Sequence, residues 1–404
     1  MRLFILLLLF LSVNALAQKI TVSAKLKDRI TGEPLPFASI GLKTKPIGTI
    51  SNAQGEFDFH IPDEYRNEIL VISMLGYERF EAPVWSLLEV KDQIILMDQS
   101  TTVLEEVVVL DSLNGGEILR NAWAHIQDNF PMKPYMMDGF YRDVKKVGGS
   151  YISLLEAAVK IYDDDYKEPR NKSRLKERVK LVEVRKSLGY ENKFTQYFGQ
   201  QNLLEDLLLH NNIRYRQLDA KEEFFELMKR DSDSYYNGHE VFVISNEQDF
   251  HLKIYVDKED FAIIRLDFEI KTQGDELAER KGLVSKFIGY KKTIDFKRFE
   301  GKMYLNYITV SSTEKWFDEK TNTLKFETEL IQHLLINEIY PNPTERIGPT
   351  EKMKNYGLEY QDYPYDKKFW ENYNVIKETP IDKQILEDLE RHVPLEKQFE
   401  DDGL

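Results

Sequence analysis

The stretch KITVSAKLKDRITGEPLPFASIGLKTKPIGTISNAQGEFDFHIP, residues 19–62, decides the fold class of the first part of the chain. Apolar and polar side chains alternate over its first eight residues, which is typical of a half-buried β-strand. Residues 28–36 contain Gly32 and two prolines and therefore predict a turn. Further apolar runs, each bounded by turn residues, follow at 37–42, 57–61, 69–74 and 94–97. Short strands with turn signals at roughly ten-residue spacing predict an all-β sandwich.

Three short blocks within this region carry a resemblance to a known family. They are TGEPLPFASIGL at 31–42, NAQGEF at 52–57 and LGYE at 75–78. In this order and spacing they resemble the carboxypeptidase regulatory-like module, a transthyretin-like β-sandwich, over residues 18–98. The resemblance implies an accessory domain and not a peptidase. Such domains lie beside the catalytic domain of metallocarboxypeptidases and at the N-terminus of TonB-dependent outer-membrane receptors. Phe37 departs from the family pattern, in which a small residue is more usual, and we expect it to alter only a loop shape.

The first 17 residues have the pattern of a secretory signal peptide. Arg2 precedes an apolar run at 3–11, and Ala15-Leu16-Ala17 predicts cleavage after Ala17. The apolar run is roughly half of the ~20 residues that a membrane-spanning helix needs, so we expect no transmembrane segment after cleavage. The chain has no cysteine, which excludes an acylated N-terminus, disulfides and thiolate metal sites. The predicted location is the periplasm or the periplasmic face of the outer membrane.

Residues 99–116 are predicted to form a linker. Within them, STTVLEEVVVL at 100–110 resembles the segment that follows the same module in TonB-dependent receptors. This segment has two possible roles. It is either a β-prone linker that docks on a sheet edge, or a segment that contacts TonB.

The remainder of the chain is predicted to contain one larger domain and a tail. Helical periodicity at 117–129 and long alternating runs up to residue 345 predict an α+β domain with a large curved antiparallel sheet. A hairpin at 253–270 weakly resembles the half-barrel of periplasmic lipoprotein-carrier proteins. Residues 346–404 are predicted to form a loop-rich tail with a short helix at 382–391. The predicted fold class is therefore mainly β.

Charge and motif content limit the function. A net charge of −14 argues against nucleic acid as a partner, because phosphate binding needs a basic surface. No histidine has a glutamate three positions later, and the chain has no His-Glu-x-x-His, Gly-x-Ser-x-Gly or phosphate-binding glycine motif. We therefore predict no catalytic residues, no cofactor and no metal site, and in particular no stoichiometric zinc.

Three smaller groups of polar residues have a structural interpretation that we prefer. The aspartates at 163–165 offer hard oxygen ligands for Ca²⁺, but consecutive acids point in different directions, so we expect a solvated turn. Arg142 and Glu156 lie on predicted neighbouring strands and are expected to form a buried ion pair. His239 and Glu240 are expected to form a hydrogen-bonded pair on the surface.

A basic run stands out in this acidic chain. Cations recur at every second position, at Arg170, Lys172, Arg174, Lys176, Arg178 and Lys180. In a strand this period places six cations on one face, so we predict an exposed strand or extended edge. One hypothesis is that this face binds an anionic partner, either an envelope protein or a lipid-like ligand. The alternative is that the charges prevent edge-to-edge aggregation.

These observations predict a non-enzymatic cell-envelope protein that binds a protein or lipid-like partner through its C-terminal sheet domain. Two alternatives stay open at this point. The first is an accessory component of a TonB-dependent outer-membrane transport system. The second is a hydrolase or transferase of unrecognised type.

Overall fold

The computed structural model describes residues 19–88, 90, 93–100, 113–191, 194–198, 203–218, 222–248, 250–270, 276–353, 357–361, 364–377, 387–390, 394 and 397–398. The predicted signal peptide lies outside these residues. So do all but the first residue of the 100–110 segment and most of the predicted helix at 382–391. None of the described helices is long and apolar enough to cross a membrane.

The N-terminal part forms two small sheets that pack against each other. Their strands are β1 Lys19–Asp28, β2 Ser39–Leu42, β3 Gly48–Ile50, β4 Glu56–Pro62, β5 Ile69–Ser73, β6 Phe80–Pro83 and β7 Ile94–Met97. The strand orders are β4-β1-β7 and β3-β2-β5-β6. Along β1 the side chains of Val22, Ala24 and Leu26 are buried while their neighbours are not. The predicted sandwich is confirmed, with β3 and β6 as strands that the sequence pattern had not indicated.

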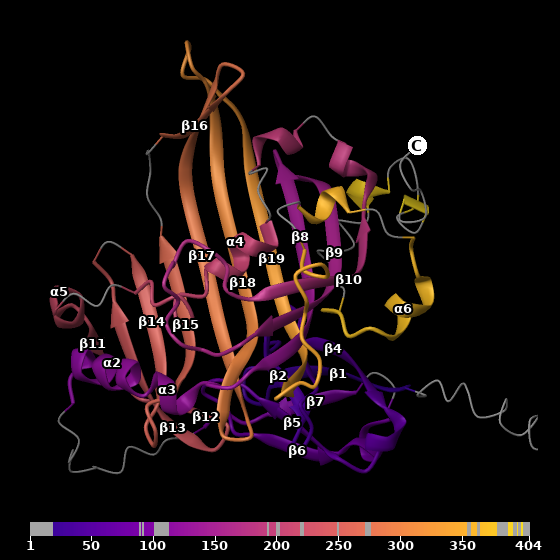
Figure 1. The fold of residues 1–404 in the computed structure, drawn as a ribbon, viewed down its shortest axis with the longest axis vertical. Helices are drawn as coiled ribbons and strands as arrows, with labels where there is room; N and C mark the ends of the chain where they lie inside the picture. The colour runs from indigo at the N-terminus through magenta and orange to yellow at the C-terminus, as the bar shows by residue number, and fades with distance from the viewer. Residues whose placement is uncertain are drawn as a thin grey trace, which may run out of the picture.

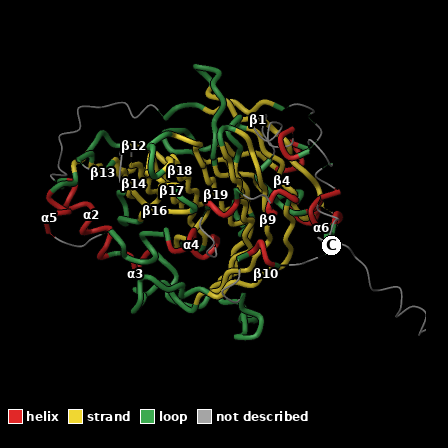
Figure 2. Tube along the Cα trace, turned by 90° about the horizontal axis from the view of Figure 1, so that it is seen from above, coloured by secondary structure: helices red, strands yellow, loops and turns green. Residues whose placement is uncertain are grey.

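The rest of the chain builds one 12-stranded antiparallel sheet. Its strands are β8 Tyr135–Val147, β9 Ser150–Asp163, β10 Arg178–Lys186, β11 Lys229–Arg230, β12 Ser234–Tyr236, β13 His239–Asn246, β14 His251–Asp257, β15 Ile263–Ile270, β16 Glu276–Arg280, β17 Leu283–Phe299, β18 Lys302–Asp318 and β19 Leu324–Pro341. The order is β10-β9-β8-β19-β18-β17-β15-β14-β13-β11, with β12 on β13 and β16 on β17. Figure 1 shows the sandwich at the base of this tall sheet, and Figure 2 shows the curvature of the sheet.

Short helices accompany the sheet. They are α2 Gly115–Ala124, α3 Ile126–Asn129, α4 Leu203–Leu209, α5 Glu222–Glu226 and α6 Lys367–Asn372. The 3-10 helices are η2 Asp63–Tyr65, η3 Val84–Leu87, η4 Leu188–Glu191, η5 Thr195–Tyr197 and η6 Leu358–Tyr360. Asn114 and Glu117 form a capping box that begins α2, a motif that stabilises a helix by roughly 1 kcal/mol. The helix predicted at 117–129 is present but is divided at His125.

Both faces of the large sheet are covered. On β18, Ile308 packs into the core that includes residues of α2 and α4, whereas its neighbour Tyr307 packs with Ile50 of the sandwich and Trp370 of α6. Figure 2 shows α2, α3 and α4 on one side of the sheet. Because successive side chains of a strand point to opposite faces, strands covered on both sides become apolar in both positions. This explains why β8 and β9 are buried almost throughout.

The sandwich is joined to the large sheet by main-chain and side-chain contacts. Ile47 forms a β-bridge with Glu338 of β19, and the Ile339 amide donates to the Pro46 carbonyl at 3.1 Å. The Phe37 ring stacks on Tyr307 with 5.6 Å between ring centroids. Phe37, whose φ is +59°, therefore contributes an aromatic contact between the two parts, which is more than the change of loop shape that we had expected.

The C-terminal segment connects the two parts a second time. Asn374 accepts from the His60 amide at 2.8 Å and donates to the His60 carbonyl at 3.2 Å. The Asn337 side chain donates to the Asn374 carbonyl at 2.8 Å, and the Tyr373 hydroxyl donates to the Gly139 carbonyl at 3.0 Å. The predicted loop-rich tail is thus packed on the sandwich and the sheet over residues 364–377.

We expect His333 of β19 to make the fold less stable in acid. Its ring stacks on Tyr307, the residue that Phe37 of the sandwich contacts. Burial, together with the nearby Arg142 charge, lowers the pKa of His333 from 6.5 to about 3. The unfolded chain takes up this proton near pH 6.5 and the folded chain does not, so stability falls as the pH drops from 6.5 towards 3. At pH 5 the protonation of His333 in the unfolded chain lowers the free energy of unfolding by about 2 kcal/mol.

Urea unfolding at pH 7 and pH 5 tests this expectation. Between the two pH values, His333→Gln should lose about 2 kcal/mol less unfolding free energy than the parent protein. The same pH dependence in both proteins would show that His333 does not cause the acid lability.

Candidate ligand pocket

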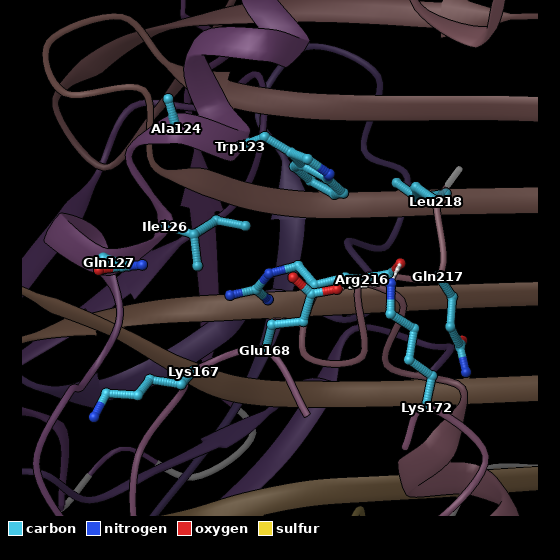
Figure 3. Close-up of a pocket in the computed structure, with 10 residues that line it drawn as sticks. All are labelled: Trp123, Ala124, Ile126, Gln127, Lys167, Glu168, Lys172, Arg216, Gln217 and Leu218. Carbon is cyan, nitrogen blue, oxygen red and sulfur yellow. Dashed lines mark hydrogen bonds and ion pairs between the residues drawn. The ribbon is translucent and has the colours of Figure 1, made fainter. Parts of the chain in front are cut away.

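A pocket of about 580 Å³ lies between the α2–α3 helices and two loops, one between β9 and β10 and one after α4. Figure 3 shows the side chains that line it. They are Trp123, Ala124, Ile126, Gln127, Lys167, Glu168, Lys172, Arg216, Gln217 and Leu218. One part of this lining is apolar and the other is charged, with three cations and one acid.

The apolar wall comes from the helices and from the end of the second loop. Ile126 and Leu218 are buried, and Trp123 packs against the main core while its ring lines the pocket. In Figure 3 the Trp123 ring points towards Leu218. Helical spacing places Trp123 on the lining side of α2, and the division at His125 lets α3 present Ile126 beside it.

The charged side of the pocket is held by hydrogen bonds between the two loops. Lys172 Nζ donates to the Arg216 carbonyl at 3.0 Å and pairs with Glu168 Oε1 at 2.8 Å. Arg216 Nη2 donates to the Tyr166 carbonyl at 3.2 Å. Burial lowers the pKa of Arg216, although neighbouring groups that include Glu168 oppose the decrease. The Lys167 side chain is two-thirds exposed, at 66%. It is therefore accessible to a ligand from solvent.

Beneath the charged side lies a buried ion network centred on Arg214. Its side chain is 0% exposed and makes two contacts with Asp163 Oδ2, at 2.9 Å from Nε and 2.7 Å from Nη2. Arg214 Nε also lies 3.6 Å from Glu177 Oε1, and Nη1 donates to the Lys167 carbonyl at 2.8 Å. The network therefore ties the loop that carries Lys167 to the loop that carries Arg214, and so supports both loops of the pocket.

Electrostatics agree with this structural role. Burial disfavours the charged form of Arg214, but the carboxylates of Glu177 and Asp163 outweigh it and raise the pKa of Arg214. Burial raises the pKa of Glu177, although Arg214 opposes the rise. Burial and the Glu177 carboxylate also raise the pKa of Tyr215, whose hydroxyl donates to Glu177. Tyr215 therefore stays protonated, and its hydroxyl remains a hydrogen-bond donor to Glu177, across the ordinary pH range.

The prediction of a basic strand is wrong for residues 170–177, which form a loop, because β10 begins only at Arg178. Three cations of the run form ion pairs with acids from other segments: Lys176 with Asp165, Arg178 with Asp164, and Lys180 with Glu351. Arg170, Lys172 and Arg174 are exposed on the loop before the strand. Of these, Lys172 reaches the pocket. Binding of an anionic partner by the run stays a prediction.

The interpretation of the aspartates at 163–165 as a solvated turn is corrected in part. Asp163 is buried, at 1% exposure, and pairs with Arg214. Asp164 and Asp165 pair with Arg178 and Lys176. Strand β9 ends at Asp163 and pairs with β10, which brings the aspartates opposite the basic run. The acids therefore neutralise cations of the chain itself.

The predicted ion pair between Arg142 and Glu156 is confirmed. The two residues are direct partners in the β8–β9 register, with 2.7 Å between Arg142 Nε and Glu156 Oε1. A second guanidinium, that of Arg185 on β10, lies 2.6 Å from Glu156 Oε2 and stacks over Trp370 at 4.4 Å. Burial opposes ionisation, but the Arg185 and Arg142 charges outweigh it and lower the pKa of Glu156. Glu156 is thus a buried, compensated carboxylate.

The expected surface pair of His239 and Glu240 is not formed. Glu240 pairs with Lys258 at 2.9 Å, and His239 Nδ1 lies 3.4 Å from Asp257 and 3.3 Å from Glu259. Among the described residues, His239, Asp257 and Glu259 have ligand atoms within 4.8 Å of one another and could hold a metal ion.

Sequence reasoning did not predict the pocket. Lys167, Glu168 and Arg216 lie in irregular segments that no periodicity connects. Trp123 lies within the helix predicted at 117–129, and the helical pattern by itself gave it no role in ligand binding. The alternation of acids and bases between 163 and 180 was the available signal that these loops pack together.

Comparison with solved structures gives distant likenesses. A lipovitellin structure described by its lipid–protein interactions is 12% identical, with a TM-score of 0.25, over 58% of this chain and 28% of that one. MucB is 9% identical, with a TM-score of 0.20, over 55% of this chain and 92% of that one. A putative membrane-associated protein of unknown function from Bacteroides fragilis is 11% identical, with a TM-score of 0.16, over 80% and 98% of the two chains. At these TM-scores the likenesses carry no argument about function.

Sequence comparison identifies a family for the N-terminal part of the chain. The family model of the CarboxypepD_reg-like domain matches residues 22–109. The TonB-dependent receptor SusC of Bacteroides thetaiotaomicron is 36% identical over 102 residues, which is 25% of this chain but only 9% of the receptor. The matched region contains the two packed sheets, and the three sequence blocks lie in it in order. Residues 22–109 are therefore a CarboxypepD_reg-like domain.

Proposed function

We propose that this chain is a non-enzymatic cell-envelope protein that binds a lipid-like molecule carrying an anionic group. Its location would be the periplasm or the periplasmic face of the outer membrane, after signal-peptide cleavage. The observation that carries the proposal is the divided lining of the pocket, with Trp123, Ile126 and Leu218 on one side and cations on the other. Its volume of about 580 Å³ lies within the range of small-molecule sites.

Each side of the pocket has a separate role in this proposal. An apolar chain gains free energy in proportion to the surface that it buries against Trp123 and Leu218, at about 25 cal/mol per Å². The anionic group meets Lys167 and Lys172, whose side chains are 66% and 45% exposed. Because these cations face solvent, their attraction should weaken with salt, over a screening length of roughly 10 Å at 0.1 M.

The lining also supports the non-enzymatic part of the proposal. It includes no serine, cysteine or histidine, and its one carboxylate, Glu168, is 58% exposed and paired with Lys172. A nucleophile with an adjacent base, which covalent catalysis needs, is therefore missing from these ten residues. The buried Glu156 does not line the pocket, because its partner Arg185 contacts Trp370, and Trp370 packs on the other face of the sheet.

Binding of a soluble anionic amphiphile tests the proposal. We expect lyso-phosphatidylglycerol, below its micelle concentration, to bind more tightly than zwitterionic lyso-phosphatidylcholine in calorimetry. The double variant Lys167→Gln/Lys172→Gln should weaken binding of the anionic lipid by roughly tenfold or more, since each basic residue near an anionic group contributes about 1 kcal/mol. Trp123→Ala should weaken binding of both lipids.

The matched control is Lys253→Gln/Lys291→Gln. It changes the net charge by the same amount at exposed side chains, with Lys253 on β14 and Lys291 on β17. It should bind within twofold of the parent. Equal weakening by the two double variants would mean general charge attraction without a site, and no binding of either lipid would reject the proposal.

A second function is favoured by the sequence match to SusC. The 36% identity over 102 residues supports an accessory role in a TonB-dependent outer-membrane transport system. Crosslinking with mass spectrometry in native envelopes would test it, because a dominant outer-membrane receptor partner is expected in that case. A crosslinking pattern without any such receptor would contradict the accessory role.

A further inference from the structure

We propose that His239, Asp257 and Glu259 form a binding site for one divalent transition-metal ion, with zinc preferred among the metals common in proteins. The residues come from the start of β13, the end of β14 and the turn between β14 and β15. The site lies outside the ligand pocket, and the proposal is independent of the proposed ligand binding. It departs from the sequence-based prediction of no stoichiometric zinc, which rested on the missing zinc motifs. No sequence motif indicated it, because 18 or more positions separate the histidine from the acids.

The distances between the ligand atoms fit a tetrahedral ion. His239 Nδ1 lies 3.4 Å from Asp257 Oδ2 and 3.3 Å from Glu259 Oε2, and all three atoms lie within 4.8 Å of one another. Ligands bound to zinc at about 2.0–2.1 Å in a tetrahedron are about 3.3–3.4 Å apart. Two of the three separations therefore match, and the Glu259 side chain, which is 73% exposed, has room to adjust its position.

The nitrogen at the centre of the group is unsatisfied. His239 Nδ1 is buried from solvent and has no hydrogen-bond partner among the described residues. A buried polar atom without a partner costs free energy, and a bound cation would satisfy it. Nδ1 thus lies at ion-pair distance from both carboxylates without a hydrogen bond to either, and a cation between the three atoms would bind all of them.

The backbone holds two of the ligands in place. Asn237 and Gly238, with φ values of +52° and +95°, form the tight turn that brings β12 into register with β13 and positions His239. Asp257 Oδ1 accepts from the Glu259 amide at 2.9 Å, and the Phe261 amide donates to the Asp257 carbonyl at 3.0 Å. Asp257 thus keeps Oδ2 directed at His239 while its other oxygen supports the turn.

The surrounding charges balance a divalent ion. Asp257, Glu259 and the adjacent Asp260 carry three negative charges, and Arg298 carries one positive charge. Arg298 contacts Asp257 Oδ2 at 3.2 Å but is held more closely by Asp260, at 2.6 Å. The neighbouring Lys258 is paired with Asp233 and Glu240. Two negative charges are therefore uncompensated, and Arg298 can keep its Asp260 pair when Asp257 binds a metal.

The ligand types select the class of metal. One imidazole nitrogen and two carboxylate oxygens suit zinc and similar first-row ions, whereas calcium takes six to eight oxygen ligands and magnesium retains an octahedral shell. Three protein ligands leave one tetrahedral position open. The expected order of binding is therefore zinc well ahead of calcium or magnesium.

Calorimetry on the full purified chain, with any affinity tag removed, tests the site. We expect one Zn²⁺ per chain, and little heat with Ca²⁺ or Mg²⁺ at the same concentrations. Glu259→Gln and His239→Gln should each weaken zinc binding by roughly tenfold or more. Because the Glu259 side chain is exposed, its variant should keep the melting temperature of the metal-free parent. Cobalt substitution should give the visible absorption of a tetrahedral site.

The matched control is His251→Gln, which removes an exposed histidine from the start of β14 and should leave zinc binding unchanged. If the parent takes up no zinc, or if His239→Gln binds zinc as tightly as the parent, the proposal is overturned. Binding that His251→Gln weakens as much as His239→Gln would indicate general surface histidine chemistry, and would overturn it as well.

Discussion

Replacing Arg214 with methionine is expected to lower the free energy of unfolding by about 3–5 kcal/mol, the usual cost of removing one partner from a buried ion pair. The Arg214 side chain is fully buried with Asp163 and lies 3.6 Å from Glu177. Methionine has a similar length but cannot compensate either acid or donate to the Lys167 carbonyl. Urea unfolding followed by circular dichroism would measure the change.

Arg174→Met is the matched control, because Arg174 is exposed on the other loop that lines the pocket, between β9 and β10, and the change of side chain is identical. It should alter the unfolding free energy by less than about 0.5 kcal/mol. A loss below about 1 kcal/mol in Arg214→Met would show that water or loop movement satisfies the two acids. The network would then not be what holds the pocket loops.

Replacing Glu156 with glutamine should have a loss of similar size, about 3–5 kcal/mol. The variant leaves Arg142 and Arg185 facing each other without the carboxylate that pairs with both. Glutamine keeps the shape and one acceptor, so the loss reports the missing charge. The unfolding free energy at pH 7 gives the measurement.

Glu226→Gln, at an exposed position of α5, is the comparison and should stay within about 0.5 kcal/mol of the parent. The difference between parent and Glu156→Gln should also shrink in acid. Because the folded-state pKa of Glu156 is lowered, its ionised form stabilises the fold above the unfolded pKa, and this stability is lost as the pH falls through the folded value. A pH-independent difference would contradict the assignment.

Local patterns determined the N-terminal domain. The alternation along β1 and the glycine and proline turns specify strands and their ends within a few residues, without reference to distant parts of the chain. The same is true of the hairpin formed by β14 and β15, and of the capping box at Asn114. The family blocks added the sandwich topology, and the family match at 22–109 agrees with them.

The pair of Arg142 and Glu156 could also be predicted, since one short turn joins β8 to β9 and the register follows from it. The third member, Arg185, could not. It reaches Glu156 only because β10 returns to the edge of β9 after a loop of 14 residues, between Asp163 and Arg178. No repeat in the sequence specifies the path of such a loop.

The candidate sites depended on tertiary structure for the same reason. By itself the sequence determined that cations alternate between 170 and 180 and that three aspartates precede them. Only the β9–β10 pairing decided that Lys176 and Arg178 are compensated by those aspartates while Lys172 lines a pocket with Trp123. Likewise, β13 and β14 bring His239 to Asp257. Charge and periodicity are local properties of a chain, whereas which charges meet depends on strand register and loop path, and these are set by burial of the whole sheet.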